Sequence, residues 1–182
     1  MAEEFVIDCG APTLAGLKTG NLFTCPYEDK KVITAELRAL NKVLVPKGLR
    51  IIPLRYSEER VLLYLYRIKD LKKDLSREEA AKILHEIGYK SCAPDQCMMR
   101  LIGRLRAHAG FPHEIGLFLS YPPEDVRGFM NDHAHCKYIG AWKVYGDVDR
   151  AKQTFARYKK CTDAYQRLWK SGTPLGKLIV AC

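Results

Sequence analysis

Residues 49–68, LRIIPLRYSEERVLLYLYRI, contain two runs of branched and aromatic residues on either side of Ser57, Glu58 and Glu59. Such residues favour extended strands, and a short polar link between two strands favours an antiparallel hairpin. Pro53 has no N–H to donate to a neighbouring strand, so its strand is expected at a sheet edge or with a bulge there. The rest of the chain must therefore cover a sheet that contains this hairpin.

Helical patterns surround the hairpin. Apolar residues at helical spacing, prolines near helix starts and glycines near helix ends predict six helices, over residues 11–23, 27–48, 75–89, 93–110, 122–132 and about 147–170. Ser76 and Glu79 match a capping box at the start of the third of these helices. Two further strands are expected over residues 114–121 and 137–146.

The order of these elements predicts the fold class. Strands that are segregated from helices, without regular alternation, favour an α+β fold over a doubly wound parallel sheet. We expect one domain over residues 1–182, with a mainly antiparallel sheet of about four strands and helices packed on it. A chain of 182 residues is long enough to bury a core of this kind.

Composition limits the setting in which the protein works. The N-terminus, MAEEFVIDCG, is acidic and lacks the basic and apolar regions of a secretory signal. Apolar runs are far shorter than the roughly 20 residues of a membrane span. Seven cysteines without an export signal favour reduced thiols. A cytoplasmic protein without membrane contact is therefore expected.

The stretch DCGAPTLAGLKTGNLFTC, residues 8–25, suggests an anion site. If a helix begins near Pro12, then Cys9 and Gly10 precede its N-terminus and Thr13 and Lys18 lie on it. Free N–H groups and a lysine there would hold an anion and lower the pKa of a nearby thiol. The alternative is that the small residues only allow close packing and that Cys9 is a buried apolar side chain.

A second candidate region lies between residues 108 and 146. His113 and Glu114 could pair as a general base with a carboxylate beside it. Tyr121 lies on the strand expected after them, and a polar strand entry is the alternative to a site there. Trp142, Tyr138 and Tyr145 beside Lys143 could stack on a base or a planar cofactor, although core packing is the alternative. His133 and His135 are residue types that bind metals, but no second ligand cluster stands at a set spacing, so no metal site is predicted.

The last third of the chain carries most of the net charge of +9, with ten Lys or Arg residues and three Asp residues between 137 and 182. The basic residues of the last long helix could dock an acidic protein, or they could be a solvated surface. The five that would carry docking are Lys152, Lys159, Lys160, Arg167 and Lys170. Nucleic acid is a less favoured partner, because no recognition motif for it is present.

Four segments, CGAPTLAGLKTGNLF, HEIGLFLSYPPEDVRGF, GAWKVYG and FARYKKCTDAY, together resemble a family from anaerobic Firmicutes, catalogued as domain of unknown function three-seven-nine-three. The resemblance runs from about Asp8 to Tyr165 and implies no catalytic residue. It implies an association with flavodoxins and iron uptake, and an acidic redox protein such as a flavodoxin is then a plausible partner.

Two functions remain open at this point. The first is binding of a small anionic molecule or cofactor by Cys9, Gly10, Thr13, Lys18, His113, Glu114, Tyr121 and Trp142, as an accessory to anaerobic redox or iron metabolism. The second is docking of an acidic protein such as a flavodoxin, or of nucleic acid, through the last long helix. The sequence does not decide whether the protein is an enzyme, which cofactor it would hold, or its oligomeric state.

Overall fold

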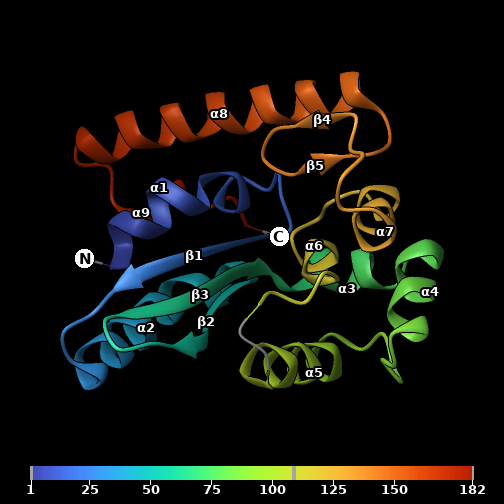
Figure 1. The fold of residues 1–182 in the computed structure, drawn as a ribbon. Helices are drawn as coiled ribbons and strands as arrows, with labels where there is room; N and C mark the ends of the chain where they lie inside the picture. The colour runs from blue at the N-terminus through green and yellow to red at the C-terminus, as the bar shows by residue number, and fades with distance from the viewer. Residues whose placement is uncertain (1, 108–109, 182) are drawn as a thin grey trace. The chain divides into compact units, whose positions relative to one another are not determined.

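Two antiparallel sheets and the helices around them make up the structure, a computed structural model that describes residues 2–107 and 110–181 (Figure 1). The chain groups into two compact units, Met1–Lys69 with Lys160–Cys182, and Asp70–Lys159. The α+β class is confirmed. The assignment of the whole chain to one domain stays a prediction.

The three-stranded sheet of the first unit is built on the expected hairpin. Strands β2 (Leu49–Tyr56) and β3 (Arg60–Arg67) pair antiparallel, and β1 (Gly20–Pro26) pairs on the other side of β3. The order β1-β3-β2 places Pro53 on an edge strand, where the pairing shifts register between Pro53 and Arg55. Both expectations for this proline are confirmed.

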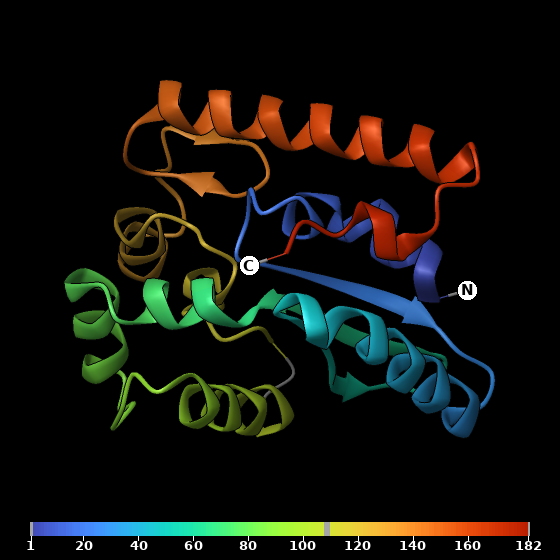
Figure 2. The same cartoon turned by 180° about the vertical axis from the view of Figure 1, so that it is seen from behind.

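Helices α1 (Ala2–Leu14) and α2 (Lys30–Leu44) cover the sheet, and Figure 2 shows α2 in front of the strands β2 and β3. The two helices share one apolar core with alternate residues of β3, namely Val61, Leu63 and Leu65. Gly10 allows this packing, because a Cβ atom there would lie 2.6 Å from the Cδ2 atom of Leu65. Gly10 thus lets helix α1 and strand β3 approach closely.

The predicted stripe of α2 is buried at Ile33, Leu37, Leu40 and Leu44. A short 3-10 helix, η1 (Val45–Lys47), then leads to a left-handed turn at Gly48, where φ is 83°. The end of this helix was therefore predicted correctly from its proline and glycine.

The prediction of a helix over residues 11–23 was wrong. The helix begins at Ala2, and residues 20–26 form β1 instead. Burial of Val6 and Ile7 in the core stabilises the earlier turns of α1, so that Pro12 lies in its last turn and not in its first. Tertiary packing outweighed the local proline signal.

Arg67 closes the first unit with a buried guanidinium group. Its side chain is 3% exposed at the end of β3. Nη1 donates to the carbonyl oxygens of Thr13 (3.0 Å) and Leu14 (3.5 Å), and Nη2 donates to that of Val180 (3.0 Å). The N–H of Val180 also donates to Leu14. One cation thus satisfies the carboxyl end of α1, where the helix dipole favours positive charge, and fixes the last residues of the unit.

We expect Arg67→Met to lower the free energy of unfolding by roughly 2–5 kcal/mol, because it removes the charged hydrogen bonds to the carbonyl oxygens of Thr13, Leu14 and Val180. Urea unfolding followed by circular dichroism measures this loss. Arg50→Met is the matched control, since Arg50 is exposed on the neighbouring strand β2. Equal stability of the two variants would contradict the role given to Arg67.

The second unit contains the remaining short elements. They are most of α3 (Ile68–Leu75), α4 (Glu78–Glu86), α5 (Pro94–Ala107), α6 (Ile115–Phe118), α7 (Pro123–Asn131), and the two-stranded sheet of β4 (Tyr138–Ile139) and β5 (Lys143–Val144). Helix α8 (Val148–Lys170) begins in this unit and ends in the first, where α9 (Leu175–Leu178) follows it.

Three local expectations fail in the second unit. Residues 114–121 were expected as a strand but contain the short helix α6, since a short apolar run does not separate helix from strand. Residues 137–146 form a small hairpin in place of one strand. No capping box forms, because the Ser76 hydroxyl donates to the carbonyl oxygen of Lys72 and Arg77 takes the N-cap position of α4.

Candidate functional site

A cavity of about 430 Å³ lies in the second unit. Its walls come from the turn before α6, from α6 and α7, and from the β4–β5 hairpin. Four aromatic rings line it: Phe111, Tyr121, Phe129 and Trp142. The volume lies within the range of ordinary small-molecule sites, which are mostly apolar with a few polar groups.

Tyr121 and Trp142 form a stacked aromatic wall. Their ring centroids are 4.5 Å apart with an interplanar angle of 26°. The ring of Phe155 on α8 is nearly perpendicular to the indole of Trp142, with a centroid distance of 4.5 Å. Gly116 on α6 makes room for this wall, since a Cβ atom there would lie 3.0 Å from the Tyr121 ring. Ser120, just before Tyr121, has a φ of 57°, a left-handed conformation uncommon for a residue other than glycine.

Asp125 fixes the position of Trp142. Its buried carboxylate, in the first turn of α7, accepts from the indole N–H of Trp142 (2.8 Å) and from the backbone N–H groups of Tyr145 (2.7 Å) and Gly146 (2.8 Å). This carboxylate therefore joins α7 to the segment that contains β5. These three donors satisfy the buried carboxylate oxygens within the protein.

The remaining polar groups in and beside the cavity belong to Lys143, Tyr121 and two histidines. Lys143 donates from Nζ to the carbonyl oxygen of His133 (2.7 Å) and lies 5.6 Å from the centre of the Phe129 ring. The Nε2 atoms of His113 and His133 are 3.3 Å apart. Burial raises the pKa of Tyr121 to about 12, so its phenol is neutral at physiological pH.

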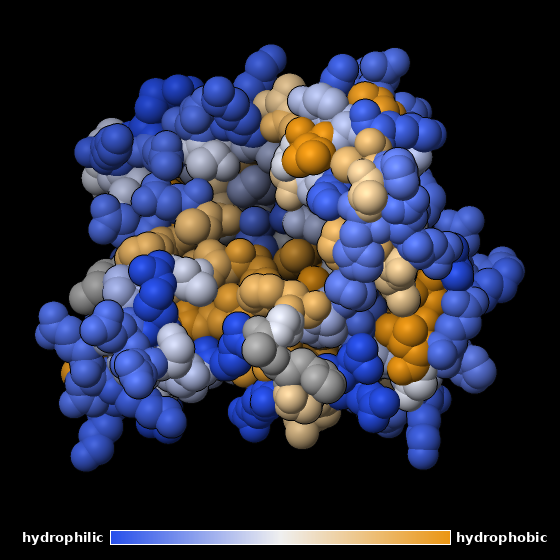
Figure 3. Space-filling model, in the orientation of Figure 1, coloured by the Kyte–Doolittle hydropathy of each residue, from blue (hydrophilic) through white to orange (hydrophobic). Residues whose placement is uncertain are grey.

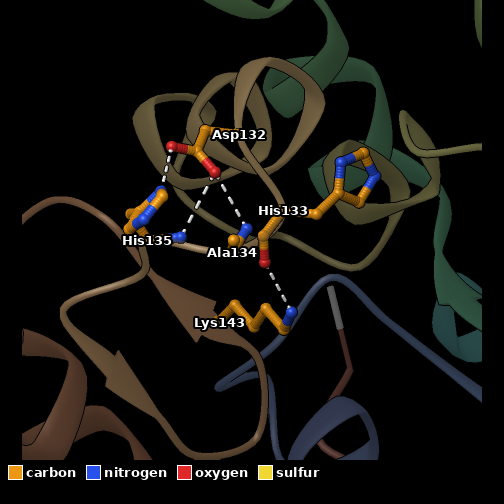
Figure 4. A network of polar contacts seen from close by, with 5 residues as sticks. All are labelled: Asp132, His133, Ala134, His135 and Lys143. Atoms are coloured by element: carbon orange, nitrogen blue, oxygen red, sulfur yellow. Dashed lines mark hydrogen bonds and ion pairs between the residues drawn. The ribbon is translucent and has the colours of Figure 1, made fainter.

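The backbone around His133 is held by Asp132, as Figure 4 shows. The Asp132 carboxylate accepts from the N–H groups of Ala134 (2.9 Å) and His135 (3.2 Å), and it pairs with Nδ1 of His135 (2.7 Å). These hydrogen bonds hold the pKa of Asp132 below its usual value. The His133 ring points away from this pair, so the two histidines of the segment have different roles.

Glu114 does not act as the partner of His113 that the sequence suggested. Its side chain is 1% exposed, and its Oε1 atom accepts from the Tyr89 hydroxyl (3.0 Å) and lies 2.6 Å from Nε of Arg104. Burial, followed by the charge of Glu114, raises the pKa of Tyr89. The ion pair joins α5 to the start of α6 and is structural.

A comparison with models of protein families matches residues 6–179 to a family described as a protein of unknown function (DUF3793). The chain belongs to this family. Comparisons with curated proteins and with solved structures gave no match. The DUF3793 match covers the described parts of both units almost completely, including every residue of the cavity.

The N-terminal candidates of this DUF3793 member lie in the first unit. Cys9 and Gly10 are inside α1 and do not precede a helix, so the expected anion site at a helix N-terminus was wrong. Thr13 is buried and donates to the Asn21 side chain at 2.7 Å. Lys18 follows the carboxyl end of α1, and burial lowers its pKa to about 8.

The Cys9 thiol is not activated. Burial and the neighbouring Asp8 carboxylate raise its pKa, which is the opposite of the expected effect, so less thiolate is present at neutral pH. We expect N-ethylmaleimide at pH 7 to label Cys9 more slowly in the native protein than in urea, with the rate rising as pH rises. Mass spectrometry of the labelled peptide measures both rates.

Asp8→Asn removes the charge that, together with burial, raises the pKa of Cys9, so it should speed labelling of Cys9 in the native protein. Glu3→Gln changes an exposed carboxylate on the same helix and should leave the labelling rate unchanged. Faster labelling in native than in unfolded protein would contradict the assignment.

All five basic residues of the docking hypothesis are exposed on α8, whose surface is mostly hydrophilic along the top of Figure 3. The six cysteines among the described residues are free thiols.

In the part of the chain that the structure describes, no helix has the length and apolar character needed to cross a bilayer.

Of the predicted ligand-binding residues, His113, Tyr121 and Trp142 share the cavity. Lys143, Asp125 and Phe129 complete it but were not predicted as ligand-binding. The contacts of Asp125 had no local signal, because its donors lie 17 to 21 residues later in the chain. The contact of His113 with His133 had no local signal, because 20 residues separate them.

Proposed function

We propose that the protein binds a planar, anionic small molecule or cofactor in the aromatic cavity of its second unit. The stacked Tyr121–Trp142 wall carries this proposal, because a flat ring system gains stacking contact on such a wall. Lys143 supplies positive charge at the same cavity, and His113 adds a group that can form hydrogen bonds. The one acidic side chain there, Asp125, is already occupied by three donors, so it repels an anion less than a bare carboxylate would.

This proposal keeps the small-molecule hypothesis but limits the binding site to the aromatic cavity of the second unit. The helix N-terminus that motivated Cys9, Gly10, Thr13 and Lys18 lies elsewhere, so these residues are not included. A cytoplasmic accessory role in anaerobic redox or iron metabolism, which the family resemblance implied, is the setting we propose for this ligand.

Riboflavin 5′-phosphate and 1-anilinonaphthalene-8-sulfonate are the probes, since both combine flat rings with an anionic group. We expect both to bind and Ala141→Trp to weaken each by at least about tenfold, because a large side chain at this position fills the cavity. Probe fluorescence during titration measures the affinity. Ala156→Trp, at an exposed site on α8, should bind as wild type does.

Circular dichroism confirms that both variants fold. Absence of binding of both probes to the wild-type protein, or the same loss in both variants, would refute the proposal.

Docking of an acidic protein such as a flavodoxin on α8 is the second candidate. It is favoured by the exposure of Lys152, Lys159, Lys160, Arg167 and Lys170 on one helix. An attraction of this kind acts between charges in water and is screened by salt. A solvated helix surface remains the alternative.

Binding of a purified flavodoxin, measured by isothermal titration, should weaken steeply between about 0.05 and 0.3 M salt. Lys159→Glu with Lys160→Glu should abolish it. Lys72→Glu with Lys73→Glu changes the net charge equally at exposed sites on α3 and should retain it. Salt-independent binding, or equal loss in both double variants, would argue against docking on α8.

A further inference from the structure

Two histidine side chains meet beside the aromatic cavity. His113 precedes α6 and lines the cavity, whereas His133 follows the end of α7. Their Nε2 atoms are 3.3 Å apart, their ring centroids are 4.7 Å apart, and the ring planes are at 70°. Because the nitrogens are closer together than the ring centres, the rings converge toward their Nε2 ends. Both side chains are exposed, so a solute can reach them.

The separation of the two nitrogens suits a shared metal ion. With Zn–N bonds of about 2.0–2.1 Å, two ligands at a tetrahedral angle have nitrogens about 3.3–3.4 Å apart. Imidazole is a ligand that zinc, nickel and copper accept readily. In the metal-free pair one ring donates an Nε2–H to the other, and both lone pairs become available once that proton moves to Nδ1.

The surroundings hold the two rings in place. Phe129 packs against both, with centroid distances of 5.1 Å to His113 and 4.4 Å to His133. The carbonyl oxygen of His133 accepts from Lys143, and Asp132 orders the next two residues (Figure 4). A pair that is ordered before binding loses less conformational entropy when it binds.

The pair supplies two ligands and leaves the other coordination positions open. Within residues 2–107 and 110–181, no group of three or more His, Cys, Asp or Glu side chains is arranged to hold a metal. Water, or an anionic group of a molecule in the cavity, would fill the remaining positions. We propose that His113 and His133 bind one divalent transition-metal ion through their Nε2 atoms.

The test is calorimetric titration of the full chain, without an affinity tag, with NiCl₂. We expect one Ni²⁺ per chain in the wild-type protein. His113→Gln and His133→Gln should each weaken binding by at least about tenfold, since even the loss of a group that only orients a ligand costs that much. His135→Gln and His85→Gln, at the two other exposed histidines that the structure describes, should leave the affinity unchanged.

No nickel binding by the wild-type protein would overturn the proposal. Unchanged nickel affinity in both His113→Gln and His133→Gln would also overturn it. An equal loss of nickel affinity in His135→Gln would do the same, because nickel would then be held elsewhere. Circular dichroism checks that the variants fold. The two cavity probes are titrated into the same variants without metal, so loss of the metal site is distinguished from loss of the cavity.

Discussion

The buried guanidinium of Arg67 is the interaction on which the first unit depends. From the end of the central strand, it donates to carbonyl oxygens of the last turn of α1 and of Val180 near the carboxyl end. No apolar residue could satisfy these oxygens, and water has little access to them. The sheet and its apolar core supply most of the burial, but Arg67 determines how the end of α1 and the last residues meet.

Asp125 has the corresponding role in the second unit, with the opposite charge. Its carboxylate gathers N–H donors from the segment around β5, just as Arg67 gathers carbonyl oxygens. The elements it joins are short, and the two strands of the hairpin have two residues each, too few to be stable through their own pairing. The position of Trp142, and with it the aromatic wall, therefore rests on a polar contact more than on secondary structure.

The sequence predicted those parts of the fold whose signals are local. The hairpin of β2 and β3, the edge position of Pro53, and helices α2, α5, α7 and α8 each follow from periodicity or from proline and glycine. It failed where distant packing decides the outcome: Val6 and Ile7 extend α1 toward the N-terminus, and residues 114–121 form α6 in place of a strand. For the site, residue type pointed to His113, Tyr121 and Trp142, but only the folded chain pairs His113 with His133 and engages Glu114 with Arg104.

The first unit is discontinuous, since Met1–Lys69 is completed by Lys160–Cys182, whereas the second unit is one uninterrupted segment. The bond from Arg67 to Val180 joins residues 113 positions apart. Contacts of such long sequence separation form late, because the chain between them must first lose its freedom. Within the first unit, the contacts that Met1–Lys69 makes with Lys160–Cys182 therefore form later than the contacts inside Met1–Lys69, such as the β2–β3 hairpin.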